Sequence, residues 1–398
     1  MRIVRIETLR LDEFPNLLWV LVHTDAGLVG LGETFFAART VEAAMHETIA
    51  PAVMGGDAFA IERHMRRLLM NYVGFKSTGA EMRAASAFDI ALWDILGQAT
   101  GQPVYNLLGG RCRDHIRAYN TCAGTRYVRA RPTQSTSDWG MDAEPGPYED
   151  LDAFLHHADD LAESLLAEGF RGMKIWPFDH AAEASGGTDI SAADLKQALE
   201  PFEKIRKRVG DRIDIHVEFH GLWNLPAALR IAGALTPYRP YWAEDPIKMM
   251  NLDALRQYRD KAGTWVTASE TLATRWAFRE LFEKRAVDVC MLDIGWCGGL
   301  SEAKKIATMA EAYELPIAPH DCTGPVLLAA SVHLGTASPN TLVQEVVRAA
   351  YHGWYQELVE GLPALADGFI APHDAPGLGI TLRPGLRNRV DAHLGVST

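Results

Sequence analysis

Seven short apolar segments of this chain end in an ionisable residue, and these residues recur at nearly constant intervals. The segments RGMKIW, IDIHVEFH, YWAEDP, VTASE, VCMLD, PIAPH and LVQE carry Lys174, Glu218, Glu244, Glu270, Asp293, His320 and Glu345. From Glu218 onward the intervals are 26, 26, 23, 27 and 25 residues. One strand, one helix and two short connections need about that many residues. The spacing therefore predicts an α/β fold, a (β/α)8 barrel of modified TIM type, with these residues at the active-site end of the strands.

The segment from residue 213 to residue 220 indicates which side chains point inward. Its four apolar residues alternate with four polar ones, and alternate residues of a strand point to opposite faces. Because the apolar face packs outward on helices, Glu218 and His220 are predicted to point into the barrel mouth together. By the same rule, Lys174 shares its face with Trp176.

Three consecutive predicted strand ends carry a glutamate, namely Glu218, Glu244 and Glu270. Carboxylates that converge at one mouth repel one another unless they are protonated or bind a cation. Oxygen ligands with no thiolate nearby suit Mg²⁺. Each glutamate could instead pair with a lysine or arginine of a neighbouring strand, but three at matching positions favour a shared Mg²⁺ site.

The first block of the chain mixes strand and helix patterns. Residues 1–14 alternate apolar and charged side chains and predict an edge strand, while residues 17–22 and 28–32 flank a turn and predict a hairpin. Helical spacing follows and is expected to end at Gly101. We therefore expect an α+β domain over residues 1–115.

The second block alternates strand and helix patterns, as parallel βα units do. It covers residues 116–364 and includes a polar stretch at 125–150, a length typical of functional loops. A chain of 398 residues exceeds the usual size of a single core, so two domains are expected. The irregular tail, residues 365–398, could fold back onto the first domain.

Charge and cysteine usage exclude several classes of function. The net charge of −12 argues against a nucleic-acid surface, which needs clustered Lys and Arg. The five cysteines form no CxxC pair and favour a reducing compartment over a disulfide framework. No apolar run approaches the roughly 20 residues that span a bilayer, so no membrane contact is expected. A soluble cytoplasmic protein is predicted.

Several motifs in order resemble the enolase superfamily, and within it the mandelate racemase-like subgroup. The motifs are AFDIALWDILGQATGQPVYNLLGG, WAEDP, TASE, DIGWCGGLSEAKKIA, LPIAPHD and VQE. The resemblance implies that the first block and the tail form an α+β capping domain on the barrel. It implies Mg²⁺ bound by Glu218, Glu244 and Glu270, a pairing of Asp293 with His320, and a homo-oligomer.

Two positions separate this chain from the racemases it resembles. Those enzymes carry Lys-x-Lys at the second strand, whereas this chain has Lys174-Ile175-Trp176, and Trp176 cannot accept a proton. Simple racemisation, which needs acid/base groups on both faces of the substrate carbon, is therefore disfavoured. The third strand ends in Glu218-Phe219-His220, which resembles the acid-sugar dehydratases of the subgroup.

The resemblance assigns a role to each remaining candidate. His320 is the predicted general base, with Asp293 accepting from its far ring nitrogen. Lys174 would lie beside the substrate carboxylate, or pair with a glutamate, or do both. Glu345 would hydrogen-bond the substrate if protonated, or bridge to Lys174. His220 would protonate the departing hydroxyl, or contact a substrate hydroxyl without proton transfer.

The expected reaction is dehydration of an acid sugar, an aldonate or aldarate, to a 2-keto-3-deoxy acid. Epimerisation, racemisation or cycloisomerisation on the same scaffold is the alternative, and a non-catalytic binding protein is a third. Substrate choice is expected to depend on the loop after residues 17–22 and on the polar stretch at 125–150. From that stretch four side chains could reach a distal group of the substrate, namely Arg126, Arg129, Arg131 and Trp139.

Overall fold

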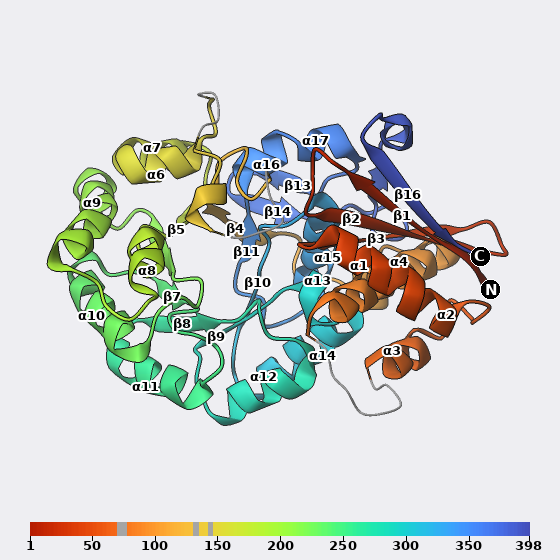
Figure 1. The fold of residues 1–398 in the computed structure, drawn as a ribbon, viewed down its shortest axis with the longest axis horizontal. Coiled ribbons are helices and arrows are strands. Elements are labelled where there is room, and N and C mark those ends of the chain that lie inside the picture. The colour runs from red at the N-terminus through yellow and green to blue at the C-terminus, as the bar shows by residue number, and fades with distance from the viewer. Residues whose placement is uncertain (70–77, 130–134, 142–145) are drawn as a thin grey trace.

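The computed structural model describes residues 1–69, 78–129, 135–141 and 146–398. Figure 1 shows a large ring of strands and helices and a smaller part in which the two chain termini lie close together. The predicted α/β class, with a barrel and a separate capping part, is confirmed.

Within the described residues, eight parallel strands form the barrel. They are β4 (Ile116–Thr121), β5 (Gly172–Ile175), β6 (Asp214–Glu218), β7 (Trp242–Glu244), β8 (Trp265–Ala268), β9 (Val289–Leu292), β10 (Ile317–Pro319) and β11 (Gln344–Val346). Their order is β10-β9-β8-β7-β6-β5-β4-β11. The backbone N–H of Leu342 donates to the carbonyl of Ile317 at 2.8 Å and links the two ends of this series. The barrel predicted from the spacing is therefore confirmed.

Helices follow the strands around the outside of the ring (Figure 1), and where a helix is amphipathic its apolar stripe faces the strands. They are α6 (Asp150–His156), α7 (Ala158–Ala167), α8 (Asp179–Ser185), α9 (Ala192–Val209), α10 (Leu225–Leu235), α11 (Leu252–Ala262), α12 (Thr274–Glu283), α13 (Ile294–Cys297), α14 (Gly299–Ala312), α15 (Pro325–Thr336), α16 (Arg348–His352) and α17 (Tyr355–Leu358). In α11, Leu255, Tyr258 and Ala262 are buried at helical spacing. The Asn251 side chain caps this helix by accepting from the backbone N–H of Ala254.

Four antiparallel strands form the capping sheet, in the order β16-β1-β2-β3. They are β16 (Ala392–Ser397), β1 (Ile3–Leu11), β2 (Leu17–Thr24) and β3 (Val29–Phe35). The predicted hairpin of β2 and β3 is confirmed. The prediction of an edge strand at residues 1–14 is wrong, because β1 pairs with β2 on one side and with β16 on the other. The second partner comes from the far end of the chain, which local alternation cannot indicate.

Helix α4 (Ala80–Thr100) packs so closely on the capping sheet that two facing positions require glycine. A Cβ atom at Gly30 would lie 2.0 Å from the carbonyl oxygen of Ala91, and one at Gly32 would lie 1.9 Å from that of Ala87. The helix ends at Gly101, whose φ is 66°, as expected. The other helices described in this part are α1 (Ala38–Ala44), a π-helical turn (Met45–Ile49), α2 (Ala50–Val53), α3 (Ile61–Leu69) and α5 (Val104–Leu107).

Buried carboxylates of α4 join the capping part to the barrel. Asp89 accepts hydrogen bonds from the backbone N–H of Ser301, at 2.9 Å, and from its hydroxyl, at 2.6 Å. Asp94 accepts from the backbone N–H groups of Leu31 and Leu378, both at 2.9 Å. These bonds tie α4 to barrel helix α14, to the capping sheet and to the tail, and so fix the capping sheet relative to the ring.

The tail contacts both parts. Strands β13 (Ala364–Ala366) and β14 (Phe369–Ala371) form an antiparallel pair, and β14 pairs with the start of β4 in the barrel. Strand β12 (Val359–Glu360) pairs with β15 (Thr381–Leu382), whereas β16 lies in the capping sheet. The division of the chain at residues 115 and 364 stays a prediction.

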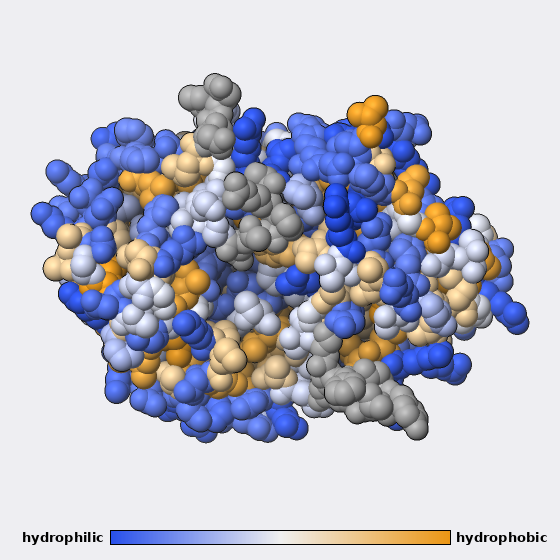
Figure 2. All heavy atoms as spheres, viewed as in Figure 1, coloured by the Kyte–Doolittle hydropathy of each residue, from blue (hydrophilic) through white to orange (hydrophobic). Residues whose placement is uncertain are grey.

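The surface carries polar groups over most of its visible area. Figure 2 shows hydrophilic side chains over much of one face, interrupted by separate apolar spots. Two large exposed apolar side chains, Met250 and Val390, lie in loops far apart in the chain. No helix in the described ranges is both long and apolar enough to cross a bilayer.

We expect Asp89 to make the stability of the protein depend on pH. Burial raises the pKa of Asp89 to about 7 from its ordinary value of 3.8. Because the folded protein keeps this proton at a pH where the unfolded chain releases it, the free energy of unfolding should fall as the pH rises between these two values, by at most about 1.4 kcal/mol per pH unit.

Asp89→Asn should remove this contribution, so its urea-unfolding free energy should depend less steeply on pH between 4 and 7 than that of the wild type. The exposed Asp253→Asn variant is the control and should keep the wild-type slope. Equal slopes for the Asp89→Asn variant and the wild type would contradict the prediction.

Candidate active site

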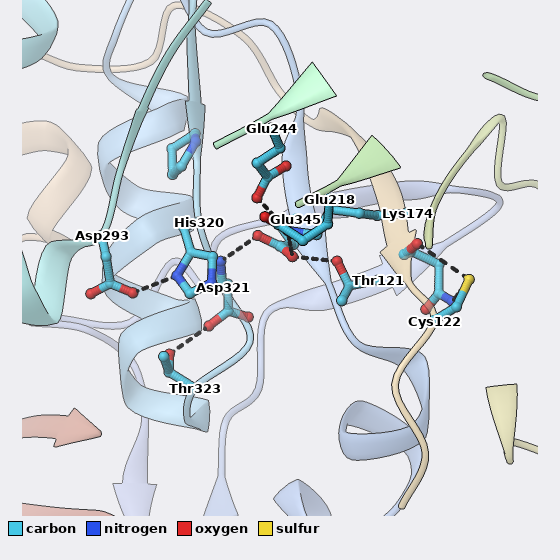
Figure 3. Close-up of polar contacts among 12 residues, drawn as sticks. Thr121, Cys122, Lys174, Glu218, Glu244, Asp293, His320, Asp321, Thr323 and Glu345 are labelled. Carbon is cyan, nitrogen blue, oxygen red and sulfur yellow. Dashed lines mark hydrogen bonds and ion pairs between the residues drawn. The ribbon is translucent and has the colours of Figure 1, made fainter. Parts of the chain in front are cut away.

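The residues predicted from the strand ends lie at one end of the barrel. Lys174 is in β5, Glu218 ends β6 and Glu244 ends β7. Glu270, Asp293 and His320 each follow their strand by one or two residues, and Glu345 is in β11. One cavity is lined by a set that includes Lys174, Glu218, His220, Glu270 and His320. The structure thus brings the candidates together, while their catalytic and metal-binding roles stay predictions. Figure 3 shows Lys174, Glu218, Glu244, Asp293, His320 and Glu345 among them.

Lys174 is the central cation of this site. Its Nζ lies 2.6 Å from Glu244 Oε1, 2.8 Å from Glu345 Oε1 and 3.5 Å from Glu218 Oε2, and all four side chains are buried. Burial alone would lower the pKa of Lys174, but Glu244 and Glu345 raise it well above its ordinary value. The lysine is therefore charged, and it balances part of the negative charge at the mouth.

Glu345 forms the bridge to Lys174 that was one of its two predicted roles. Burial would raise the pKa of Glu345, but Lys174 and His320 lower it to about 2. Its carboxylate also accepts from the Thr121 hydroxyl and, at 2.9 Å, from the backbone N–H of Asp321. An ionised Glu345 with these partners is an acceptor, which argues against the alternative of a protonated donor to substrate.

Several carboxyl groups around Lys174 also lie close to one another, and this crowding changes their pKa values. Burial raises the pKa of Glu218 to about 7, although Lys174 opposes the change. Burial and the neighbouring Glu218 raise the pKa of Glu244 well above its ordinary value. Asp245, which the sequence analysis did not select, joins this group, since burial and Glu270 raise the pKa of its carboxyl too. The signal for Asp245 was its place beside Glu244 in the WAEDP motif.

This donor set suits a hard divalent cation. All of its ligand atoms are carboxylate oxygens, which Mg²⁺ prefers. Glu270 Oε2 is buried and has no hydrogen-bond partner, so one oxygen is free to bind a cation. Among the described residues, however, no three His, Cys, Asp or Glu side chains are already arranged around a common point as in a complete metal site. Glu218 and Glu244 instead contact Lys174.

His320 is paired with Asp293 in the way that the sequence predicted. The Nδ1 atom of His320 lies 2.7 Å from Asp293 Oδ2, and the two residues follow the adjacent strands β10 and β9. Burial alone would lower the pKa of His320, but Glu345, Asp293 and Glu270 together raise it to about 10. The bond leaves Nε2 of His320 as the ring nitrogen available to a substrate.

His220 has a carboxylate partner that the sequence analysis missed. Its Nδ1 atom lies 2.7 Å from Oδ2 of Asp179, the first residue of α8. Burial alone would lower the pKa of His220, but Asp179 outweighs burial and raises it. Asp179 follows β5 beyond a turn, where strand alternation no longer predicts direction. Its only signal was a position shortly after Lys174.

Aromatic side chains form much of the cavity wall. Phe36, Tyr127, Trp176 and Trp296 line it, together with Thr121, Val128 and Cys322. Trp176 is one of these wall residues, and its ring meets that of His220 edge to face with centroids 5.9 Å apart. Phe36 follows capping strand β3, so the capping part closes one side of the cavity.

The side chains expected to reach a distal substrate group are differently placed. Arg129 lies over the Phe14 ring, 4.4 Å from its centroid, and pairs with Glu13 at 3.0 Å. It therefore ties the loop after β1 to the polar stretch and does not line the cavity. Arg126 is exposed and outside the cavity lining, and Trp139 is buried against Trp176. Arg131 lies outside the described residues.

The chain matches the two domain models of one enzyme family. Residues 14–109 match the mandelate racemase / muconate lactonizing enzyme N-terminal domain. Residues 157–386 match the enolase C-terminal domain-like family. Together these two matches cover most of both parts of the fold.

Curated and solved relatives extend over the whole chain. A D-galactonate dehydratase of Ralstonia nicotianae is 32% identical over 396 residues, which is 97% of this chain and 93% of the relative. A crystal structure of an enolase of the mandelate racemase subgroup from Agrobacterium tumefaciens is 52% identical, with a TM-score of 0.88, and covers 100% of this chain and 99% of its own. An enolase protein from Sargasso Sea environmental sequencing is 44% identical, also with a TM-score of 0.88, and the match covers 100% of this chain and 98% of that one.

We expect Lys174→Met to destabilise the folded protein. The substitution would leave the buried carboxylates Glu244 and Glu345 without their cation, at a cost of about 3–5 kcal/mol. The melting temperature in calorimetry should fall, and adding Glu345→Gln to the variant should restore part of the loss by removing one uncompensated charge. Lys196→Met, on the exposed surface of α9, is the control and should melt like the wild type. A Lys174→Met variant that melts like the wild type would refute the charge-balance argument.

Proposed function

The chain belongs to the mandelate racemase / muconate lactonizing enzyme family of the enolase superfamily, and from this premise we propose that it dehydrates an acid sugar to a 2-keto-3-deoxy acid. One observation carries the proposal: two histidines, each bonded to an aspartate, line one cavity from strands on opposite sides of the ring. His220 follows β6 and His320 follows β10, four places away in the ring of eight.

In the proposed reaction the neutral form of His320 removes the proton from the carbon next to the substrate carboxylate. Asp293 accepts from Nδ1 of His320, which fixes the tautomer and directs Nε2 at the substrate. The charged Lys174 orients the carboxylate and balances the negative charge that develops on it. When bound, Mg²⁺ would be held by Glu218, Glu244 and Glu270 and would supply positive charge at the same oxygens.

The second half of the reaction breaks the bond to the neighbouring hydroxyl. The electron pair left on the substrate forms a carbon–carbon double bond as the hydroxyl departs, and a proton delivered to that oxygen completes a water molecule. The resulting enol becomes the 2-keto-3-deoxy acid. His220 or the protonated His320 can supply the proton, since both line the cavity.

An aldonate is the substrate class that we propose to test first, because two D-galactonate dehydratases are among the relatives, each 32% identical to this chain. We also propose that the enzyme is a cytoplasmic homo-oligomer. The location and the assembly are the ones expected from the sequence, whereas the choice of an aldonate narrows the expected substrate class.

Epimerisation is the second candidate, and the same pair of histidines favours it. His220 could return a proton to the face opposite His320, in the place of the lysine base that Trp176 replaces. Product chemistry separates the two reactions, because a keto acid reacts with semicarbazide and an epimer does not.

The first test is a screen of aldonates and aldarates with the purified protein and Mg²⁺, with keto-acid formation followed by semicarbazide. We expect turnover of at least one acid sugar and a loss of about 100-fold or more in kcat/KM for His320→Asn, which removes the general base. Retained turnover in that variant would refute the assignment of the base. An epimer formed without keto acid would favour the second candidate.

Removal of divalent cations tests the metal site. We expect chelation by EDTA to abolish turnover and excess Mg²⁺ to restore it, because the glutamates alone cannot stabilise developing negative charge. Calorimetric titration should show weaker Mg²⁺ binding by Glu270→Gln than by the wild type. The exposed Glu283→Gln variant should bind like the wild type. Turnover that persists in EDTA would exclude a catalytic cation.

A further inference from the structure

The side chain of Asp179 contacts His220, one of the two histidines that could protonate the departing hydroxyl in the proposed reaction. We propose that Asp179 is a positioning residue that holds His220 so that its Nε2–H delivers the proton to the departing hydroxyl, separate from the proton removal by His320. This inference rests on the proposed function, and it assigns the two halves of the dehydration to two different histidine–aspartate pairs.

The contact itself is short and protected from water. Asp179 Oδ2 lies 2.7 Å from His220 Nδ1, and the carboxylate is only 6% exposed. Within the described parts of the chain no Lys or Arg forms an ion pair with Asp179, and its other oxygen, Oδ1, has no hydrogen-bond partner. The imidazole is therefore the group that satisfies this buried carboxylate.

The bond determines which ring nitrogen faces the cavity. With Nδ1–H donating to Asp179, Nε2 is the nitrogen left for the substrate. The backbone N–H of His220 donates to Glu218 Oε1 at 2.6 Å, and the ring edge of Trp176 packs against the imidazole. These contacts hold both the main chain and the ring of His220. The hydrogen bond to Asp179 then sets how the imidazole is rotated against Trp176.

The two pairs have matching geometry on opposite sides of the site. Asp293 contacts Nδ1 of His320 at 2.7 Å, the same distance and the same ring nitrogen as in the pair of Asp179 and His220. Strands β6 and β10, which lead into the two histidines, are four places apart in the ring. A substrate between them would meet one imidazole at each side.

Protons and electrons balance when the pairs have separate tasks. The bond between hydrogen and the carbon next to the carboxylate breaks, and its proton goes to Nε2 of His320. The carbon–oxygen bond at the next carbon breaks with its electron pair on oxygen, and the proton on Nε2 of His220 converts that oxygen to water. His220 then regains a proton from solvent, and His320 loses one.

The test compares two rates for the aldonate turned over in the screen, in D₂O with Mg²⁺. Proton NMR follows both keto-acid formation and deuterium entry at the carbon next to the carboxylate in recovered substrate. For Asp179→Asn we expect dehydration to fall about 100-fold, as is typical when an acid–base group is misplaced. Exchange should fall much less, so the ratio of exchange to dehydration should rise at least 10-fold.

Variants at other positions separate positioning from general damage. His220→Asn should raise the ratio like Asp179→Asn, and the double variant should lose no more activity than either single one, because the aspartate acts through the histidine. Asp293→Asn should slow both rates together. Glu183→Gln, on the same helix α8 but bonded to Thr136, should keep both rates. Asp179→Ser replaces Asp179→Asn if circular dichroism shows that the latter is misfolded.

Equal losses of exchange and dehydration in the Asp179 variant, or unchanged dehydration, would overturn the inference. Losses that add fully in the double variant would also overturn it. These results differ from failure of the proposed function, in which the wild type itself forms no keto acid from any acid sugar of the screen.

Discussion

The charge balance around Lys174 is the interaction on which the site depends. One buried ammonium contacts three buried carboxylates, from β6, β7 and β11, so strands on both sides of β5 are held by the same ion pairs. Buried charges are costly unless they are paired, which is why this lysine and these glutamates must stay together. The remaining crowding of carboxylates is what makes the mouth suited to a divalent cation.

The barrel mouth is completed by the capping part, and buried carboxylates hold the two together. Asp89 and Asp94 of α4 bind barrel helix α14, strand β3 and the tail through hydrogen bonds of 2.6 to 2.9 Å. Through this attachment Phe36, next to β3, comes to line a cavity whose acid and base groups all belong to barrel strands and their loops. The acid and base groups of the cavity therefore come from the barrel, whereas part of the cavity wall comes from the capping part.

Much of the barrel could be predicted because its periodicity is local. Each strand and each helix places its apolar residues by its own period, so the ends of the strands, such as Glu218 and Glu244, could be located from spacing. The partner of β1 could not, since β16 is supplied by residues nearly 400 positions away in the chain. Arg129 was expected near the substrate, but its contacts with Phe14 and Glu13 depend on how the loop after β1 packs, which has no local signal.

The sequence by itself determined the fold class and the order of the strands' functional residues, because regular strand and helix lengths bring every strand end to one face of a parallel barrel. Its resemblance to a known family implied the pairing of His320 with Asp293. Only the tertiary structure decided that Asp179 contacts His220 and that Glu345 is an ionised partner of Lys174. Those contacts depend on turns and on side-chain packing across the ring, where distance in space no longer follows distance along the chain.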